Sequence, residues 1–284
     1  MPDSIRTVLV LGAGTMGHGI AHVCAQAGCQ VRLFDVKDEL AQAGIAKIRG
    51  NLDKGVEKGK VTAADRDQTL ARLAATSDLA GASKDIDLCV EAVPESLELK
   101  GKVFSTVHQH APAHAILASN TSSLSLTALA AASGRPARTI GLHFFNPVHI
   151  MKLLEIVLAE QTAPDVLETC RTFGEGIGKT TIVVKDSPGF ATSRLGLVIG
   201  LEAMRMVESG VASAEDIDKA MELGYGHPMG PLKLTDLVGL DVRLAIAEHL
   251  HKEVGEQFRP PALLRRLVRA GKLGKKTGEG FYRW

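Results

Sequence analysis

The stretch that decides the fold is TVLVLGAGTMGHGIAHVCAQAG, residues 7–28. Residues 7–11 form an unbroken apolar run, which is typical of a parallel strand covered on both faces. A glycine turn follows, and a helix is predicted from about residue 15 to Gly28, a residue type that ends helices. Residues 29–35, CQVRLFD, then alternate between polar and apolar and predict a second strand. These segments make a strand–helix–strand unit of about thirty residues.

The turn GAGTMG, residues 12–17, matches the pattern GxGxxG directly after a strand and at the start of a helix. Gly12 permits the tight turn, Gly14 lets a pyrophosphate approach the backbone, and Gly17 lets the helix pack on the strand. The N–H groups and dipole of the helix N-terminus favour an anion there. The alternative is a tight turn without a ligand. The expected dinucleotide contacts in this motif are Gly12, Gly14, Thr15, Met16 and Gly17.

Asp35 ends the second predicted strand, eighteen residues after Gly17. A carboxylate at this place accepts hydrogen bonds from the ribose hydroxyls of NAD and repels the 2′-phosphate of NADP. NAD is therefore the expected cofactor, with a solvated aspartate at a strand end as the alternative. An FAD-binding fold shares the glycine pattern, but 284 residues are few for one.

Strands and helices continue to alternate downstream, which predicts an α/β fold of the Rossmann type, with a doubly wound and mostly parallel sheet. Residues 37–75 are polar and predict two helices, broken near GKVT at 59–62. Further helices are expected at 96–110 and 164–176. Strands are expected at 86–93, 115–119, 139–145, 153–158 and 180–184.

The pattern changes at KDSPGF, residues 185–190, where Pro188 and Gly189 interrupt it. We therefore expect two domains, an NAD-binding Rossmann domain at 1–186 and a smaller all-α domain at 187–284. Within the second, Ser213 and Asp216 predict a capping box. The helices expected there span 195–207, 214–223, 239–253 and 261–270.

Composition excludes several classes of protein. The net charge is +1 and aromatic residues make up 4%, so no nucleic-acid partner is expected. The N-terminal residues lack the basic and apolar regions of a signal peptide, and the most apolar helix, 195–207, is too short to span a membrane. The four cysteines form no CxxC pair and are expected to be buried, with no metal site. These features predict a reducing compartment, the cytoplasm.

Polar residues gather at the predicted ends of three strands, in VEAVPE (90–95), ASNTSS (118–123) and HFFNP (143–147). Ligands bind at the carboxyl ends of parallel strands, so we expect these clusters to face the nicotinamide. Their polar members are Glu91, Glu95, Ser119, Asn120, Thr121, Ser122, Ser123, His143 and Asn146.

His143 and Glu155 place an imidazole and a carboxylate in the apolar run LHFFNPVHIMKLLE, residues 142–155. Hydride transfer from a secondary alcohol needs a base for the hydroxyl proton, and histidine suits that role at neutral pH. A carboxylate on the other ring nitrogen fixes the tautomer and stabilises the imidazolium that forms. Nearby hydroxyl donors would hold the substrate oxygen. The alternative is a hydrogen-bonded core histidine.

Seven motifs, in order along essentially the whole chain, resemble the L-3-hydroxyacyl-CoA dehydrogenase family, and within it the short 3-hydroxybutyryl-CoA type. The resemblance implies an acyl-CoA substrate and the reversible oxidation of (S)-3-hydroxyacyl-CoA by NAD to 3-oxoacyl-CoA and NADH. It also implies a helical domain for dimerisation. The seven motifs are GAGTMG, VEAVPE, ASNTSS, GLHFFNPVHIMKLLEIV, KDSPGF, YGHPMGPLKLTDLVGLD and LGKKTGEGFY.

The resemblance also implies the catalytic roles. His143 is the general base, Glu155 its orienting carboxylate, and Ser122 a hydrogen-bond donor to the substrate's C3 oxygen near the nicotinamide. The family usually has an asparagine three residues past the phenylalanine of KDSPGF, as a fourth polar member of the site. Here Ser193 stands in its place, and its single hydroxyl lacks the amide's two-pronged geometry.

Cofactor and substrate contacts follow from the same resemblance. Glu95, Lys100 and Asn146 would lie along the cofactor, which Ser122 would also contact. Lys54, one of several basic residues in the polar segment 37–75, would contact the phosphates of CoA. The alternative for Lys54 is an ordinary solvated helix face.

Two other functions share these features. Relatives with the same histidine–glutamate site act on CoA-free hydroxy acids such as carnitine or gulonate, and a crystallin-like protein would keep the fold and bind NAD without turnover. The basic residues of the segment 37–75 favour CoA, and the intact Ser122, His143 and Glu155 favour an enzyme.

The helix expected at 195–207 is apolar nearly all round. Such a helix must be buried on most sides. Because fewer than a hundred residues form the second domain, we expect a homodimer in which a partner subunit covers this helix.

Overall fold

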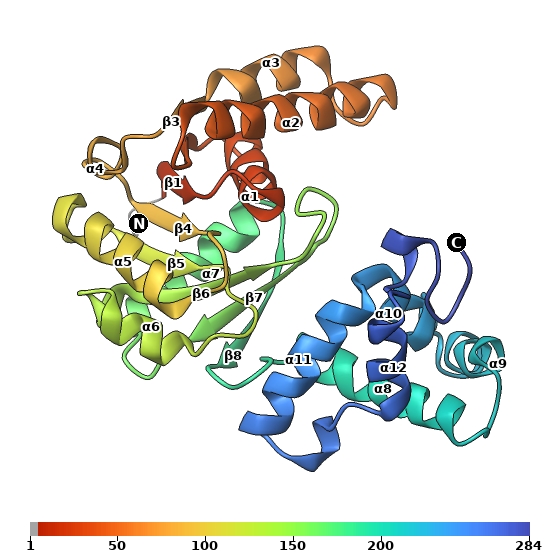
Figure 1. Ribbon diagram of the computed structural model, residues 1–284. Coiled ribbons are helices and arrows are strands. Elements are labelled where there is room, and N and C mark those ends of the chain that lie inside the picture. Colours follow the sequence, from red (N-terminus) through yellow and green to blue (C-terminus); the bar gives the residue numbers. More distant parts are fainter. Residues whose placement is uncertain (1–4) are drawn as a thin grey trace. The chain divides into compact units, whose positions relative to one another are not determined.

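The computed structural model describes residues 5–284, and the chain divides into two compact units, Met1–Asp186 and Ser187–Trp284 (Figure 1). The first unit is a β-sheet with flanking helices, and the second is almost entirely helical. The predicted fold class, an α/β domain followed by a smaller all-α domain, is confirmed.

The sheet of the first unit has eight strands in the order β3-β2-β1-β4-β5-β6-β7-β8. All neighbouring strands are parallel except β6 and β7, which are antiparallel. The order reverses beside β1, and this switch point is where doubly wound sheets bind ligands. The strands are β1 (Thr7–Leu11), β2 (Gln30–Phe34), β3 (Leu73–Thr76), β4 (Leu88–Glu91), β5 (Ile116–Ser119), β6 (Thr139–Phe144), β7 (Leu153–Leu158) and β8 (Thr180–Lys185).

The central strands are buried along their length, since helices cover the sheet. Every residue of β4, β5 and β6 is buried. The polar residues Glu91, Ser119 and His143 therefore lie inside the protein and need partners there. The α-helices of this unit are α1 (Thr15–Gln26), α2 (Asp38–Glu57), α3 (Ala63–Ala71), α4 (Leu79–Ala82), α5 (Leu97–His110), α6 (Leu126–Ala132) and α7 (Pro164–Gly176), with a short 3₁₀ helix η1 (Pro136–Arg138).

One segment of the first unit differs from the prediction. Residues 73–75 were expected within the helical region 37–75, but together with Thr76 they form β3, which pairs in parallel with Val31–Phe34 of β2. This short segment, LAAT, gains ladder hydrogen bonds at the sheet edge, and that pairing outweighs the helix propensity of its alanines. The predicted pair of helices, broken near residues 59–62, is confirmed as α2 and α3, which run side by side in Figure 1.

The second unit packs its helices around one apolar cluster, which includes Leu197, Leu201, Met204, Leu232 and Leu250. The predicted helix 214–223 is shorter than expected, because a π-helical turn, η2 (Ala220–Gly224), replaces its end. Its predicted cap is confirmed, since the Ser213 hydroxyl accepts a hydrogen bond from the Asp216 N–H at 3.1 Å. The remaining helices are α8 (Thr192–Glu208), α9 (Ala214–Lys219), α10 (Pro231–Val238), α11 (Leu240–Glu253), η3 (Glu256–Phe258), α12 (Ala262–Arg269) and η4 (Lys275–Thr277).

The four cysteines, at 24, 29, 89 and 170, are buried free thiols. Burial raises the pKa of all four, which makes them poor nucleophiles and metal ligands. Across residues 5–284 no helix combines the length and apolar character that crossing a membrane requires.

Candidate active site

The glycine turn between β1 and α1 leaves an open cradle. Gly12 has a φ of +92°, and a Cβ there would lie 2.8 Å from the Ala92 carbonyl oxygen. A Cβ on Gly17 would lie 1.6 Å from the Gly12 carbonyl oxygen, so helix and turn touch without room for a side chain. A Cβ on Gly14 would meet no protein atom within 4 Å. The space at Gly14 is therefore where a ligand can approach the backbone.

The N-terminus of α1 is suited to an anion. Gly14 is the N-cap, no side chain caps the helix, and its first turn contains no acidic residue. The N–H groups of Thr15, Met16 and Gly17 have no acceptor within the helix, because the first N–H groups of a helix never do. These donors and the helix dipole fit a diphosphate.

Asp35 follows β2 and links it to the glycine turn. Its Oδ2 accepts a hydrogen bond from the Ala13 N–H at 2.8 Å, and its Oδ1 accepts one from the Val36 N–H at 2.8 Å. An ionised carboxylate has about four acceptor positions. The remaining capacity of Asp35 fits the two hydroxyls of a ribose next to the diphosphate cradle.

A buried ion cluster lies at the carboxyl ends of β4 and β5. The Lys100 ammonium, in the first turn of α5, donates to Glu91 Oε1 at 2.7 Å and to the Val93 carbonyl at 3.2 Å, and its Nζ lies 3.0 Å from Glu95 Oε2. Three acceptors match the three hydrogens of an ammonium. Glu91 also accepts from the Ser119 hydroxyl at 2.7 Å, which joins the two strands.

Glu95 holds the hydroxyl-rich turn that follows β5. Its Oε1 accepts hydrogen bonds from the Thr121 hydroxyl, from the Ser122 N–H at 3.2 Å and from the Ser123 hydroxyl at 3.0 Å. These bonds fix the backbone that carries the Ser122 side chain.

The pKa values of the two carboxyl groups in the cluster, Glu91 and Glu95, shift in opposite directions. Burial raises the pKa of Glu91, although Lys100 counteracts it. Burial also acts to raise the pKa of Glu95, but the charge of Lys100 and the hydrogen bonds from Thr121 and Ser123 outweigh it and lower that pKa. Glu95 is therefore ionised at neutral pH.

His143 and Glu155 lie opposite one another on the antiparallel strands β6 and β7. The Nδ1 atom of His143 is 2.7 Å from Oε2 of Glu155, whose side chain is fully buried. An ionised carboxylate accepts a hydrogen bond, so Nδ1 carries the proton and the lone pair of the neutral ring is on Nε2. The ring also packs against Phe145, with centroids 4.6 Å apart. This tautomer is the one a general base requires.

The clusters at the ends of β5 and β6 are joined. The Asn120 side chain, directly after β5, accepts a hydrogen bond from the Phe144 N–H at 2.9 Å. The turn that carries Ser122 is thereby fixed to the strand that carries His143. This hydrogen bond is one physical reason why the polar residues at the carboxyl ends of β5 and β6 lie together, as predicted.

Three further predicted site residues lie on loops or helix surfaces. Asn146 follows β6, is exposed and precedes Pro147 through a cis peptide bond. Lys54 is exposed in the last turn of α2. Ser193 lies in the first turn of α8, in the second unit. Their contacts with cofactor or substrate remain predictions.

Comparison with known families accounts for nearly the whole chain. Residues 7–187 match the family described as "3-hydroxyacyl-CoA dehydrogenase, NAD binding domain". Residues 189–284 match "3-hydroxyacyl-CoA dehydrogenase, C-terminal domain". The chain belongs to the 3-hydroxyacyl-CoA dehydrogenase family. The family expected from the sequence motifs, with its NAD-binding domain, is confirmed.

Similar proteins carry consistent names. The chain is 44% identical to a "Probable 3-hydroxybutyryl-CoA dehydrogenase" of Bacillus subtilis over 98% of this chain and 97% of that one. It is 44% identical to a "3-hydroxybutyryl-CoA dehydrogenase" of Mycobacterium tuberculosis, over 99% of each chain. The solved structure of an (S)-3-hydroxybutyryl-CoA dehydrogenase from Ralstonia eutropha is similar with a TM-score of 0.95, at 41% identity over 99% of each chain.

In this member of the 3-hydroxyacyl-CoA dehydrogenase family, Glu91 and Ser119 were expected only as members of the polar strand-end clusters, without a role of their own. Glu91 ends β4, and Lys100 is the fourth residue of α5, nine positions later, a spacing that lets a strand end and the following helix meet. A lysine in the first turn of a helix, where acidic residues are favoured, was the available signal.

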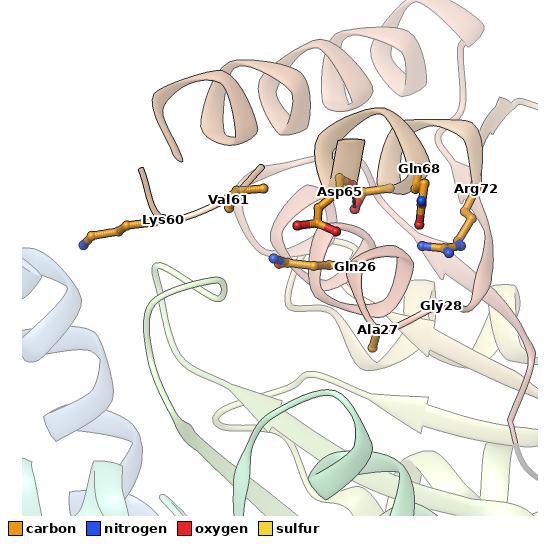
Figure 2. A pocket seen from close by; sticks show the side chains of 9 residues that line it. Gln26, Ala27, Gly28, Lys60, Val61, Asp65, Gln68 and Arg72 are labelled. Atoms are coloured by element: carbon orange, nitrogen blue, oxygen red, sulfur yellow. Dashed lines mark hydrogen bonds between the residues drawn. The ribbon is translucent and has the colours of Figure 1, made fainter. Parts of the chain in front are cut away.

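A pocket of about 330 Å³ lies away from this site (Figure 2). It adjoins the C-terminal end of α1 and the start of β2. The pocket therefore lies at the amino ends of the strands, whereas Asp35 follows the carboxyl end of β2. In Figure 2 Lys60 points away from Asp65 and Arg72. Arg72 donates to the Ala25 carbonyl at 3.2 Å. Because dinucleotides bind at the carboxyl ends of the strands, this pocket is not the cofactor site.

Proposed function

We propose that the protein oxidises (S)-3-hydroxyacyl-CoA to 3-oxoacyl-CoA in a reversible, NAD-dependent reaction, with 3-hydroxybutyryl-CoA as the short-chain substrate. The observation that carries the proposal is the hydrogen bond between His143 and Glu155. It lies near the strand ends where the turn that carries Ser122 is fixed to β6. The names of the full-length relatives support the substrate.

In the proposed reaction His143 accepts the hydroxyl proton of the substrate on Nε2. Glu155 stabilises the imidazolium that forms, because its buried carboxylate accepts the Nδ1–H hydrogen bond. When bound, NAD supplies the hydride acceptor for the hydrogen on C3. In the reverse direction His143 returns the proton to the C3 oxygen. The products are 3-oxoacyl-CoA, NADH and one proton.

Ser122 is the proposed donor to the C3 oxygen, since Glu95 fixes its backbone and orients the turn. Ser193 is the proposed fourth polar residue. A hydroxyl reaches less far than an asparagine amide and offers one donor instead of two. We therefore expect either a bridging water between Ser193 and the thioester, or a weaker hold on the thioester.

The proposed cofactor contacts begin with the glycine turn, where Gly12, Gly14, Thr15, Met16 and Gly17 receive the diphosphate. Asp35 then accepts the adenosine ribose hydroxyls, and Glu95, Lys100, Ser122 and Asn146 lie towards the nicotinamide. For Lys100, which is 1% exposed, the support is indirect, because its three hydrogens already have acceptors. We propose Lys54 as the contact to a CoA phosphate.

The second unit is the proposed dimerisation and substrate domain, and the first the proposed cofactor domain. The expectation that the helix at 195–207 is covered on most sides needs refinement. Leu197, Leu201 and Met204 of α8 fill the core of their own unit, whereas Leu195 is 62% exposed. We propose that a homodimer covers the exposed apolar side chains of this unit, which include Leu195, Ile199, Leu234, Leu237, Val238 and Val242.

The cytoplasm is the proposed compartment. Four buried free thiols support it, since reducing conditions keep cysteines unpaired.

Steady-state kinetics tests the activity. NADH oxidation should be rapid with acetoacetyl-CoA, and His143→Ala should lower kcat by at least about a hundredfold. A CoA-free 3-oxo acid that is reduced faster than the thioester would replace the proposed substrate. NAD binding without turnover on any of these compounds would refute the enzyme.

A further inference from the structure

Glu91, Lys100 and Glu95 form a cluster that carries one net negative charge. The two oxygens of Glu91 accept hydrogen bonds from Lys100, from the Val93 N–H and from Ser119, the arrangement expected of an ionised carboxylate. Burial raises the pKa of Glu91, and these three donors, with the charge of Lys100 first, oppose that rise and favour the ionised form. Glu95 is ionised as well. Within residues 5–284, Lys100 is the only cation in ion-pair contact with either carboxylate. Two negative charges and one positive charge therefore leave a charge of −1.

Water screens this charge weakly. The side chains of Lys100 and Glu91 are 1% and 0% exposed. Glu95, at 38%, is the member that reaches solvent. Charges that are partly or wholly buried act over longer distances than surface charges, because the effective dielectric constant is lower and salt cannot enter.

The cluster lies beside the glycine turn, on the side of β1 away from Asp35. In the parallel pair β1 and β4, Glu91 is the register partner of Leu11, the residue before Gly12. The Ala92 carbonyl is the group that leaves no room for a Cβ on Gly12. In a doubly wound sheet the adenosine half of the dinucleotide lies over β2 and the other half over the strands beyond β1. The nicotinamide half therefore lies on the cluster's side.

We propose that the Glu91–Lys100–Glu95 cluster biases cofactor binding towards the oxidised dinucleotide, with Glu91 and Lys100 as buried positioning residues behind Glu95. The inference rests on the proposed function only for the identity of the cofactor. The nicotinamide ring carries a positive charge when oxidised and none when reduced, and the rest of the molecule is the same. A fixed negative charge therefore stabilises the oxidised form selectively.

This bias has a chemical consequence. Stabilising bound NAD⁺ relative to bound NADH makes the bound NADH a stronger reductant than it would be at the same site without the cluster's charge. The equilibrium on the protein therefore shifts towards reduction of a 3-oxo group.

Glu91→Gln is the cleanest variant for a test. The amide oxygen can still accept from Lys100 and the Val93 N–H, and the amide N–H can donate to the Ser119 hydroxyl. The substitution removes one unit charge from a fully buried position outside the proposed cofactor contacts. The ratio of Kd for NAD⁺ to Kd for NADH should rise about tenfold, the factor expected for one charge acting over roughly 10 Å at an effective dielectric constant of about 20.

The measurement is a fluorescence titration with NADH and its displacement by NAD⁺, without any acyl-CoA. Glu98→Gln is the matched control, because Glu98 is exposed on the same helix α5 and lies outside the cluster. Its ratio should equal that of the wild type. Should Glu91→Gln not fold, Glu95→Gln removes the other carboxylate charge of the cluster and should shift the ratio in the same direction, together with any loss of affinity for both forms that comes from its own proposed cofactor contact.

An unchanged ratio in a folded Glu91→Gln protein with the wild-type Tm would overturn the proposal. An equal rise in the Glu98→Gln control would also overturn it, because the effect would then not belong to the cluster. A protein that fails to reduce acetoacetyl-CoA but shows the expected ratios would refute the proposed substrate and leave this inference standing.

Discussion

His143 and Glu155 face one another across the antiparallel strands β6 and β7, with Nδ1 and Oε2 2.7 Å apart. Backbone pairing, rather than side-chain flexibility, sets this distance, because the two residues are register partners. The arrangement holds the imidazole in one tautomer and one orientation. In a mostly parallel sheet, the single antiparallel step is what places the two residues opposite each other.

Glu155→Gln should lower kcat by about a hundredfold or more, with a smaller change in KM for acetoacetyl-CoA. A glutamine cannot supply the charge that stabilises the imidazolium, and its amide permits the wrong tautomer. Steady-state kinetics over a pH range measures both parameters. Glu160→Gln, an exposed carboxylate two residues past β7, is the control and should behave as the wild type. Near-normal turnover in Glu155→Gln would remove this residue from the mechanism.

Gly14→Ala and Gly17→Ala should separate binding from stability. A methyl group on Gly14 meets no protein atom within 4 Å, whereas one on Gly17 would lie 1.6 Å from a carbonyl oxygen. Gly14→Ala should therefore keep the wild-type Tm and lose at least tenfold in NAD affinity. Gly17→Ala should lower Tm by several degrees or abolish folding. Thermal melts and NADH titrations test the pair, and equal losses of Tm in both variants would contradict it.

Local patterns were sufficient to predict much of the site. The glycine turn, Asp35 and His143 lie at or near the ends of strands that short sequence periods reveal, and Glu155 lies within the next such strand, β7. The contact between Lys100 and Glu91 was not predictable in the same way, because it depends on how α5 packs against β4. The strand β3 was missed for a related reason, since its pairing with β2 is a long-range interaction that overrides local propensity.

Arg243→Met is expected to raise the stability of the second unit. Arg243 is 7% exposed, burial lowers its pKa, and its Nε has no hydrogen-bond partner among residues 5–284. No carboxylate in that part of the chain pairs with it. Replacing an uncompensated buried charge by an apolar side chain of similar length removes its desolvation cost, so Tm should rise by a few degrees.

The matched control for Arg243 is Arg205→Met. Arg205 pairs with Glu202 at 3.0 Å and donates to the carbonyls of Gln257 and Arg259, so its loss should lower Tm. A drop in Tm for Arg243→Met as well would mean that its guanidinium has an anionic partner from outside the chain.

Stability should fall between pH 6.5 and pH 4 because of His22. Burial, followed by the neighbouring His149, His18 and Lys179, lowers the pKa of His22 from 6.5 to about 4. Its ring stacks on His149 with centroids 5.3 Å apart, and its Nδ1 has no partner among residues 5–284. Between these pKa values the unfolded chain binds a proton that the folded chain does not. Stability therefore decreases as the pH falls through this window, by up to about 3 kcal/mol.

His22→Leu should remove this part of the pH dependence. The variant has no group to protonate at position 22, so its free energy of unfolding should decline less steeply between pH 6.5 and pH 4. Chemical denaturation at several pH values measures the slope for both proteins. His110→Leu, which removes an exposed histidine from the end of α5, is the control and should keep the wild-type slope. Parallel curves for the wild type and His22→Leu would mean that another group causes the loss of stability in acid.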